Sequence, residues 1–112
     1  MKELIDKIVK FRDERNWEQF HSIKDLLIGL NIEVGELQEL FLWDKNPDLK
    51  DVKHEIADIF IFLAYLCKKL NIDLETAVLE KLEIHSNHYP IAKSKNKTIK
   101  HTEINTKNEN NI

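Results

Sequence analysis

Hydrophobic side chains recur every three or four positions along most of the first 90 residues. This spacing places them on one face of an α-helix, and it is found in four separate stretches. The stretches cover about residues 2–14, 23–43, 49–70 and 74–88. The pattern predicts an all-α fold, in which the protomer resembles a four-helix bundle with short connections.

Residues that start and stop helices separate these stretches. Ser22 and Asp73 are suited to cap the second and fourth helices, because a side-chain oxygen there accepts a hydrogen bond from a free backbone N–H. Pro47 enforces a turn between the second and third helices. We therefore expect a helical domain over residues 1–90. A basic, polar tail at 91–112 is expected to be extended or mobile unless a partner chain holds it.

The third predicted helix is apolar around nearly its whole circumference over residues 56–67. Such a helix must be buried on most sides, and a chain of 112 residues offers few neighbours to cover it. Assembly into a homo-oligomer is therefore expected. The run is too short to cross a bilayer, which needs about 20 apolar residues, and no signal peptide is recognisable. We expect a cytoplasmic protein with no membrane partner.

Charge and composition narrow the choice of partners. The net charge is −3, but residues 1–90 carry 12 basic and 18 acidic side chains, while five Lys and two Glu stand in 91–112. An acidic body argues against a nucleic-acid polymer as partner. It is compatible with cations that in turn recruit phosphates. The single cysteine, Cys67, excludes an internal disulfide and is expected to be a small buried hydrophobe.

Two pairs of carboxylates interrupt the apolar surfaces of the second and third predicted helices. Glu33 and Glu36 share one helix face, and so do Glu55 and Asp58, because residues three apart are neighbours on a helix. Such pairs are common on solvated faces, but an ionised carboxylate against apolar surface needs a compensating charge. Oxygen ligands without nearby Cys or paired His suit Mg²⁺, with Mn²⁺ as a substitute. The pattern predicts a Mg²⁺ site that binds a polyphosphate.

These residues also carry a family resemblance. Glu33-Val-Gly-Glu36 followed by Glu55-Ile-Ala-Asp58 resembles the ExxE and ExxD signature of the MazG-like all-α nucleoside-triphosphate pyrophosphatases. Residues 11–21 and 33–43 resemble the dCTP pyrophosphatase branch of that family, and the likeness extends over about residues 3–97. It implies hydrolysis of an NTP or dNTP to the monophosphate and pyrophosphate. It also implies a homotetramer whose sites are shared between neighbouring subunits.

Carried over by position, the resemblance assigns roles to individual residues. Glu33, Glu36, Glu55 and Asp58 would hold Mg²⁺. As a separate hypothesis of mechanism, Glu36 or its neighbour Glu33 orients or deprotonates the attacking water. Trp17 and Trp43 would enclose the nucleobase. The other residues that the resemblance places near the nucleotide are His21, Phe62, Lys81, His85, Tyr89 and Lys93. The chain departs from the family at His85, where Asn is frequent, and at Asn96, where Gly is frequent.

Three alternatives stay open at this stage. Each tryptophan, lying near a helix end, has an alternative role as a packing residue. The chain could be a helical oligomerisation or regulatory module that binds nucleotides without hydrolysing them, although its four acidic residues are intact. A di-iron bundle requires Glu-x-x-His on two helices, and only Glu18 and His21 form that motif, in a connection. The sequence also leaves open whether the substrate is dCTP, a modified dCTP or a broader set of dNTPs.

Overall fold

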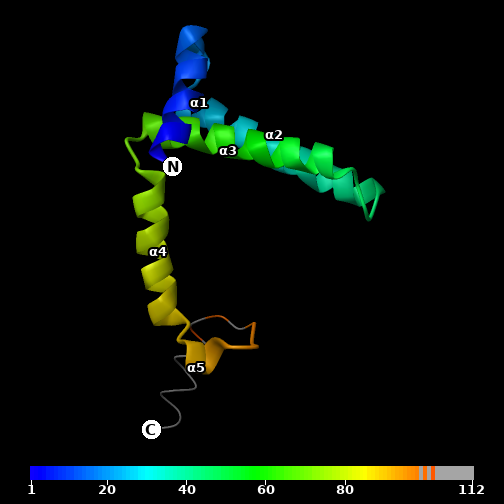
Figure 1. Cartoon of the computed structure of the whole chain (residues 1–112), viewed down its shortest axis with the longest axis vertical. Helices are drawn as coiled ribbons and strands as arrows, with labels where there is room; N and C mark the ends of the chain where they lie inside the picture. The colour runs from blue at the N-terminus through cyan, green and yellow to red at the C-terminus, as the bar shows by residue number, and fades with distance from the viewer. Residues whose placement is uncertain (99, 101, 103–112) are drawn as a thin grey trace. The chain divides into compact units, whose positions relative to one another are not determined.

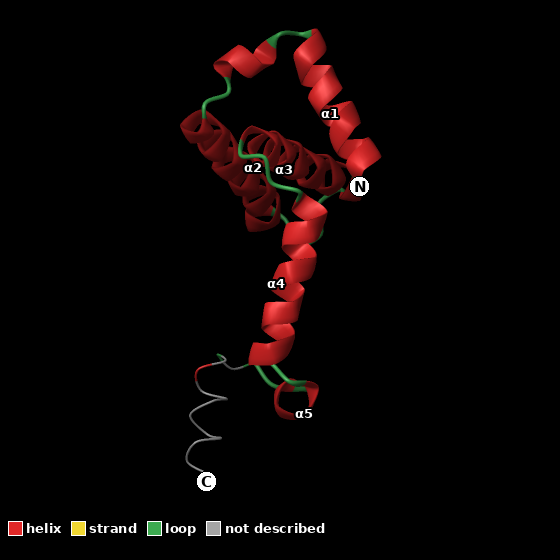
Figure 2. Ribbon diagram, turned by 90° about the vertical axis from the view of Figure 1, so that its left-hand side faces the viewer, coloured by secondary structure: helices red, strands yellow, loops and turns green. Residues whose placement is uncertain are grey.

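All regular structure that is described in this protein is helical (Figures 1 and 2). The computed structural model describes residues 1–98, 100 and 102, and these contain no strand. The elements are α1 (Lys2–Glu14), the 3₁₀ helix η1 (Trp17–Phe20), α2 (Ile23–Trp43), α3 (Leu49–Lys69), α4 (Leu74–His88) and α5 (Ile91–Ser94). The all-α prediction is confirmed. Among the described residues, no helix is long and apolar enough to span a membrane.

Short polar contacts fix where the long helices begin and end. The Ser22 Oγ accepts a hydrogen bond from the Asp25 N–H at 3.1 Å, which starts α2 as the sequence predicts. Asp48 starts α3 in the same way, by accepting from the Lys50 N–H at 2.9 Å. Asn71 ends α3 in a left-handed conformation with φ 56°, which asparagine tolerates better than most residues.

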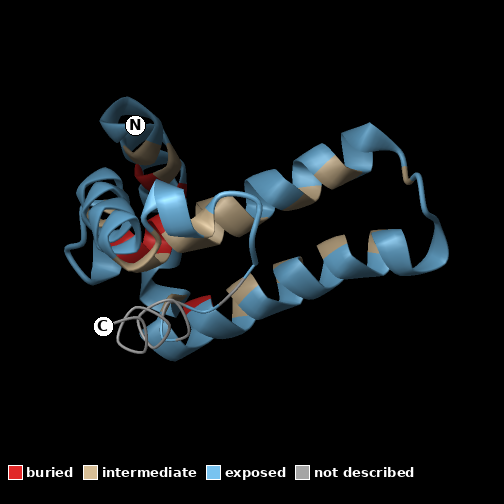
Figure 3. Ribbon diagram, turned by 90° about the horizontal axis from the view of Figure 1, so that it is seen from below, coloured by how far each residue is buried: buried red, intermediate tan, exposed pale blue. Residues whose placement is uncertain are grey.

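The chain divides into two compact units, Met1–Leu74 and Glu75–Ile112. In the first unit α2 and α3 lie side by side as an antiparallel hairpin, and α1 packs against α3 (Figure 1). The buried apolar residues are Val9, Leu26, Ala64, Tyr65 and Cys67. They gather at the end of the hairpin that is remote from its turn (Figure 3). Cys67 is a buried free thiol, as expected, and burial raises its pKa.

Most of the large apolar side chains lie outside this small core. Ile56 on α3 is 53% exposed, and Leu79 on α4 is 61% exposed. The second unit contains α4 and α5, and no described residue of these two helices is buried. An exposed apolar surface on both units is what the sequence leads us to expect of a chain that associates with further copies. The oligomeric state itself stays a prediction.

The segment after residue 90 differs from its expected extended form at its start. Ile91–Ser94 forms α5, because the carbonyl oxygen of Pro90 accepts hydrogen bonds from the N–H groups of Lys93 and Ser94, both at 3.0 Å. Asn96 follows with φ 65°. A left-handed residue at this position favours Gly and accepts Asn. Residues 99, 101 and 103–112 of the predicted tail lie outside the described residues, and the boundary at residue 90 stays a prediction.

Candidate metal and nucleotide site

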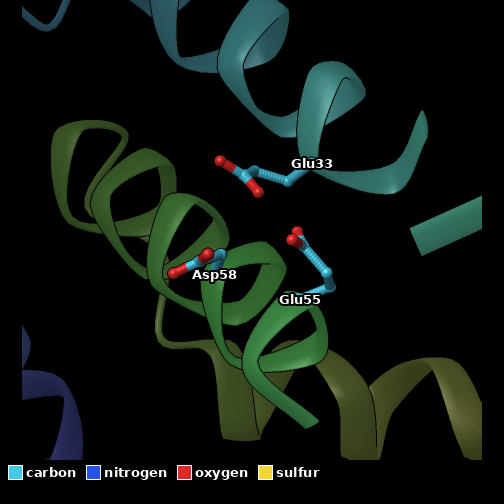
Figure 4. Close-up of side chains that lie close together, drawn as sticks. All are labelled: Glu33, Glu55 and Asp58. Carbon is cyan, nitrogen blue, oxygen red and sulfur yellow. The ribbon is translucent and has the colours of Figure 1, made fainter. Parts of the chain in front are cut away.

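Three carboxylates from two helices meet in the α2–α3 hairpin. Glu33 extends from α2 toward Glu55 and Asp58 on α3 (Figure 4). One oxygen from each of the three lies within 4.8 Å of the other two. The i, i+3 spacing puts Glu55 and Asp58 on the same face of α3, and the antiparallel pairing of the helices brings that face opposite Glu33.

Glu36, the fourth predicted ligand, stands outside this group of three. It is exposed and lies one turn further along α2 than Glu33. Its negative charge nevertheless reaches the group, because it helps to raise the pKa of Glu33. Glu36 is therefore close enough to act on the cluster electrostatically without being among its three converging oxygens.

The three carboxylates are crowded in a way that favours a bound cation. The Oε2 atoms of Glu33 and Glu55 are buried, and neither has a hydrogen-bond partner within the described part of the chain. Burial, a hydrogen bond that protonated Glu33 can share with Glu55, and the charges of Glu36 and Asp58 raise the pKa of Glu33 from 4.5 to about 7. A hard divalent cation would relieve this repulsion through oxygen ligands alone. The donor set therefore fits such an ion.

One turn beyond the carboxylates, aromatic side chains continue the interface between α2 and α3. Phe62 lies edge-on to Tyr65, with ring centroids 6.4 Å apart. Tyr65 in turn meets the His21 ring at 5.2 Å and the Arg12 guanidinium at 5.5 Å. Burial, followed by the positive charges of Arg12 and Lys69, lowers the pKa of His21. These surroundings favour the neutral imidazole, and its buried Nδ1 has no hydrogen-bond partner among the residues described.

Trp17 packs against residues at the C-terminal end of α1. Its ring lies edge-on to Phe11 at 5.8 Å. The Arg15 guanidinium lies 3.6 Å from the Phe11 ring centroid and donates a hydrogen bond to the Phe11 carbonyl at 2.9 Å. Trp17 itself is still 43% exposed. Packing against Phe11 therefore fixes one part of the indole and leaves the rest exposed, and a nucleobase contact by Trp17 stays a prediction.

Trp43 is the last residue of α2 and is 79% exposed. Trp17 precedes the first residue of the same helix. Trp17 itself lies in η1, and α2 alone, with 21 residues, is roughly 30 Å long at 1.5 Å per residue. The two tryptophans are thus on opposite sides of α2 in the chain order.

The remaining predicted contacts lie in the second unit. Lys81, His85 and Tyr89 are four residues apart and share one face of α4 and its end. The His85 and Tyr89 rings have centroids 6.1 Å apart, and Lys93 lies on α5. The predicted site residues are thus divided between the two units, with the carboxylates and tryptophans in the first.

Three residues that shape this region were not selected from the sequence. Arg12 is charged yet only 5% exposed, and it forms an ion pair with Asp13 at 2.8 Å. Tyr65 is buried among Phe62, His21 and Arg12. Gly29 adjoins Phe62 in the middle of α2. Of these three residues, Gly29 alone could have been noticed in the sequence, because a single glycine inside a helical pattern usually has a packing reason.

Comparison with known proteins identifies the class. The model of the MazG-like family matches residues 28–104, more than half of the chain. The chain therefore belongs to the MazG-like family, and the resemblance carried by its two acidic motifs is confirmed.

Individual relatives agree with this assignment. The chain is 37% identical over 105 residues to human dCTP pyrophosphatase 1, an alignment that covers 85% of this chain and 62% of that protein. It is 35% identical to the rat protein of the same name over the same shares. The chain thus spans less than two thirds of the length of these curated relatives. A crystal structure of a pyrophosphatase from Archaeoglobus fulgidus superposes with a TM-score of 0.71 at 37% identity, covering 80% of this chain and 92% of that one.

Proposed function

We propose that this chain is a Mg²⁺-dependent nucleoside-triphosphate pyrophosphatase of the cytoplasm, which converts dCTP or a modified dCTP to the monophosphate and pyrophosphate. The observation that carries the proposal is the convergence of Glu33, Glu55 and Asp58 from two helices. Similarity to proteins named dCTP pyrophosphatase 1 supports the choice of substrate. Similarity to the archaeal pyrophosphatase supports the reaction.

Glu33, Glu55 and Asp58 would hold the metal, and Glu36 would join them from the exposed adjacent turn. When bound, Mg²⁺ supplies positive charge that stabilises the phosphate oxygens, and Mn²⁺ can replace it. Ionised Glu33 is the form that binds a cation, so metal binding requires the loss of the proton that its raised pKa retains.

Among the four acidic residues, Glu36 is the one proposed to activate water. It stands outside the three converging oxygens and is open to solvent, so the carboxylate oxygen that does not hold the metal would accept a proton from a water molecule. The water oxygen then forms a bond to the α-phosphorus while the bond from that phosphorus to the bridging oxygen breaks. Pyrophosphate leaves with the bonding electrons, and no Ser, Cys or Lys nucleophile is needed.

Two copies of the chain would contribute to one nucleotide site. Trp17 lies in η1, ahead of α2, and Trp43 is the last residue of α2, so we propose that a base enclosed by both receives them from different chains. Phe62 follows Asp58 by one turn of α3, and His21 meets Tyr65 further along that helix. Both are proposed to lie near the nucleotide, and Lys81, His85, Tyr89 and Lys93 are proposed to contact phosphate or sugar. A homotetramer would cover the exposed apolar side chains of both units.

A panel of nucleotides tests the function directly. With Mg²⁺ present, the purified protein is expected to release pyrophosphate from dCTP faster than from the other common dNTPs. Omission of the metal is expected to stop the release. Nucleotide binding without any pyrophosphate release would instead identify the non-catalytic regulatory module.

Tryptophan fluorescence tests the two proposed base contacts. The chain has two tryptophans, so Trp17→Phe and Trp43→Phe each leave one reporter. In both variants dCTP is expected to quench the remaining indole, because stacking on a base changes its surroundings. Pyrophosphate alone should not quench it, since pyrophosphate carries no base. An indole that does not respond to saturating dCTP would be a packing residue.

Light scattering tests the assembly. The chain has a mass of 13.3 kDa, and the wild type is expected to have about four times this mass in solution. Leu79→Glu places a charge on the exposed apolar side of α4 and is expected to lower the mass at micromolar concentration. Glu80→Gln, an adjacent change between polar residues, serves as the control. A wild-type protein that remains monomeric would contradict the shared site.

A further inference from the structure

We propose that Gly29 is a positioning residue for the nucleobase, because its missing side chain lets the Phe62 ring rest against α2 and so leaves room for the base. The inference rests on the proposed function, which places Phe62 beside the nucleotide. It adds a residue that contacts no ligand itself and acts through the position of a neighbouring ring.

The first observation is the contact between Gly29 and Phe62. A β-carbon at position 29 would lie 2.5 Å from Phe62 Cε1, 2.8 Å from Cζ and 3.0 Å from Cδ1. These distances are shorter than carbon atoms tolerate. Any residue other than glycine at this position would therefore displace the ring from its present place.

The second observation is where this contact lies. Gly29 is one turn before Glu33 on α2, and Phe62 is one turn after Asp58 on α3. Residues four apart lie on the same helix face, so the Gly29–Phe62 contact forms the layer directly next to the carboxylates. The position of the ring therefore limits the space beside the proposed metal and triphosphate.

The third observation limits where a displaced ring can go. Tyr65 closes one side of the Phe62 ring, at a centroid separation of 6.4 Å, and is itself only 5% exposed. A buried side chain packed against Arg12 and His21 yields little space. A ring pushed away from α2 has to leave its present place beside the carboxylates, and we expect this to change the space proposed for the base.

The test is Gly29→Ala, with steady-state kinetics on dCTP in saturating Mg²⁺. We expect KM to rise about tenfold and kcat to stay within about twofold, because uniform binding is lost while the reacting groups are unchanged. Inhibition by inorganic pyrophosphate should keep the wild-type constant, because this product has no base. If Gly29→Ala merely weakened the fold, the KM for dCTP and the inhibition constant of pyrophosphate would change together.

Two further variants isolate the contact. In a Phe62→Leu background, the methyl group that Gly29→Ala adds has no ring to displace. We therefore expect Gly29→Ala to have little further effect on KM there, so that the effects of the two mutations are not additive. Gly35→Ala is the matched control on the same helix, since a β-carbon there has nothing within 4 Å. It is expected to leave both KM and the pyrophosphate inhibition constant unchanged.

Several results would overturn the inference while leaving the proposed function intact. The first is an active Gly29→Ala enzyme with the wild-type KM for dCTP. The second is a rise in KM on Gly29→Ala that is equally large in the wild type and in Phe62→Leu. The third is a pyrophosphate inhibition constant that changes in parallel with KM. If Gly29→Ala alone does not fold, the Gly29→Ala, Phe62→Leu double variant decides: its KM must match that of Phe62→Leu. A wild-type protein that hydrolyses no nucleotide would overturn the proposed function and this inference together.

Discussion

Asp58→Asn is expected to lower kcat/KM for dCTP by at least about 100-fold in saturating Mg²⁺, a typical effect of removing one group that stabilises charge in a transition state. The same variant should unfold at a higher temperature than the wild type when metal is absent. Asp58 belongs to the group of three carboxylates within 4.8 Å and contributes to the repulsion that raises the pKa of Glu33. Its neutral replacement relieves that repulsion and removes a ligand at once.

A loss of activity together with a gain in metal-free stability would identify Asp58 as a metal ligand, because replacing a residue that supports the fold would lower both. Asp51→Asn is the matched control, because Asp51 is an exposed aspartate on the same helix, about two turns away. Its variant should keep wild-type kcat/KM and should not gain stability, because Asp51 stands in the first turn of α3, where a negative charge is favourable. An Asp58→Asn protein with full Mg²⁺-dependent activity would contradict the proposed metal site. A variant that loses both activity and metal-free stability would show that Asp58 supports the fold instead.

The helices could be predicted from the sequence because their signals are local. Ser22 caps α2 through a residue three positions away, and the i, i+3 spacing of Glu55 and Asp58 depends on one helix alone. Such features require no knowledge of how distant segments meet. The segment at Pro90 shows the limit of local reasoning, since its polar composition indicated an extended tail while its backbone forms the single turn of α5.

What the sequence could not provide is the register between α2 and α3. Glu33 stands opposite Glu55 and Asp58, and Gly29 stands opposite Phe62. A step of four residues back along α2 thus matches a step of four forward along α3, as expected of antiparallel helices. A different register would keep every local pattern and lose the cluster. The pKa of Glu33 and the role proposed for Gly29 both depend on this pairing.

The chemistry of the site is likewise only partly local. Two acidic pairs indicate a hard cation, because their ligand type is visible in the sequence. The proposed enclosure of a base by Trp17 and Trp43 has no such local signal, because the whole of α2 lies between the two residues in the chain. The enclosure therefore stays a proposal, and it rests on the further proposal that more than one copy of the chain contributes to a site.

Metal-free protein is expected to lose stability as the pH rises from about 5 to 8, and Mg²⁺ is expected to restore it. Glu33 has its pKa raised from 4.5 to about 7 in the folded chain. Between these two values the folded state keeps a proton that the unfolded state has released, so stability falls as the pH increases through this window and is constant above it. The effect should be on the order of 1 kcal/mol, below the full linkage value, because the carboxyl is partly open to water.

The measurement is the difference in unfolding free energy between pH 5 and pH 8 for the wild type and for Glu33→Gln, which cannot titrate at this position. The wild type should lose more stability over this range than Glu33→Gln, whereas Glu39→Gln, an exposed change on the same helix, should behave as the wild type. Because Mg²⁺ must displace the Glu33 proton, its affinity should fall with decreasing pH, by up to about tenfold per unit below pH 7. Equal pH dependence in wild type and Glu33→Gln, together with pH-independent Mg²⁺ affinity, would show that Glu33 titrates as an ordinary surface carboxylate and that the three oxygens do not share one cation.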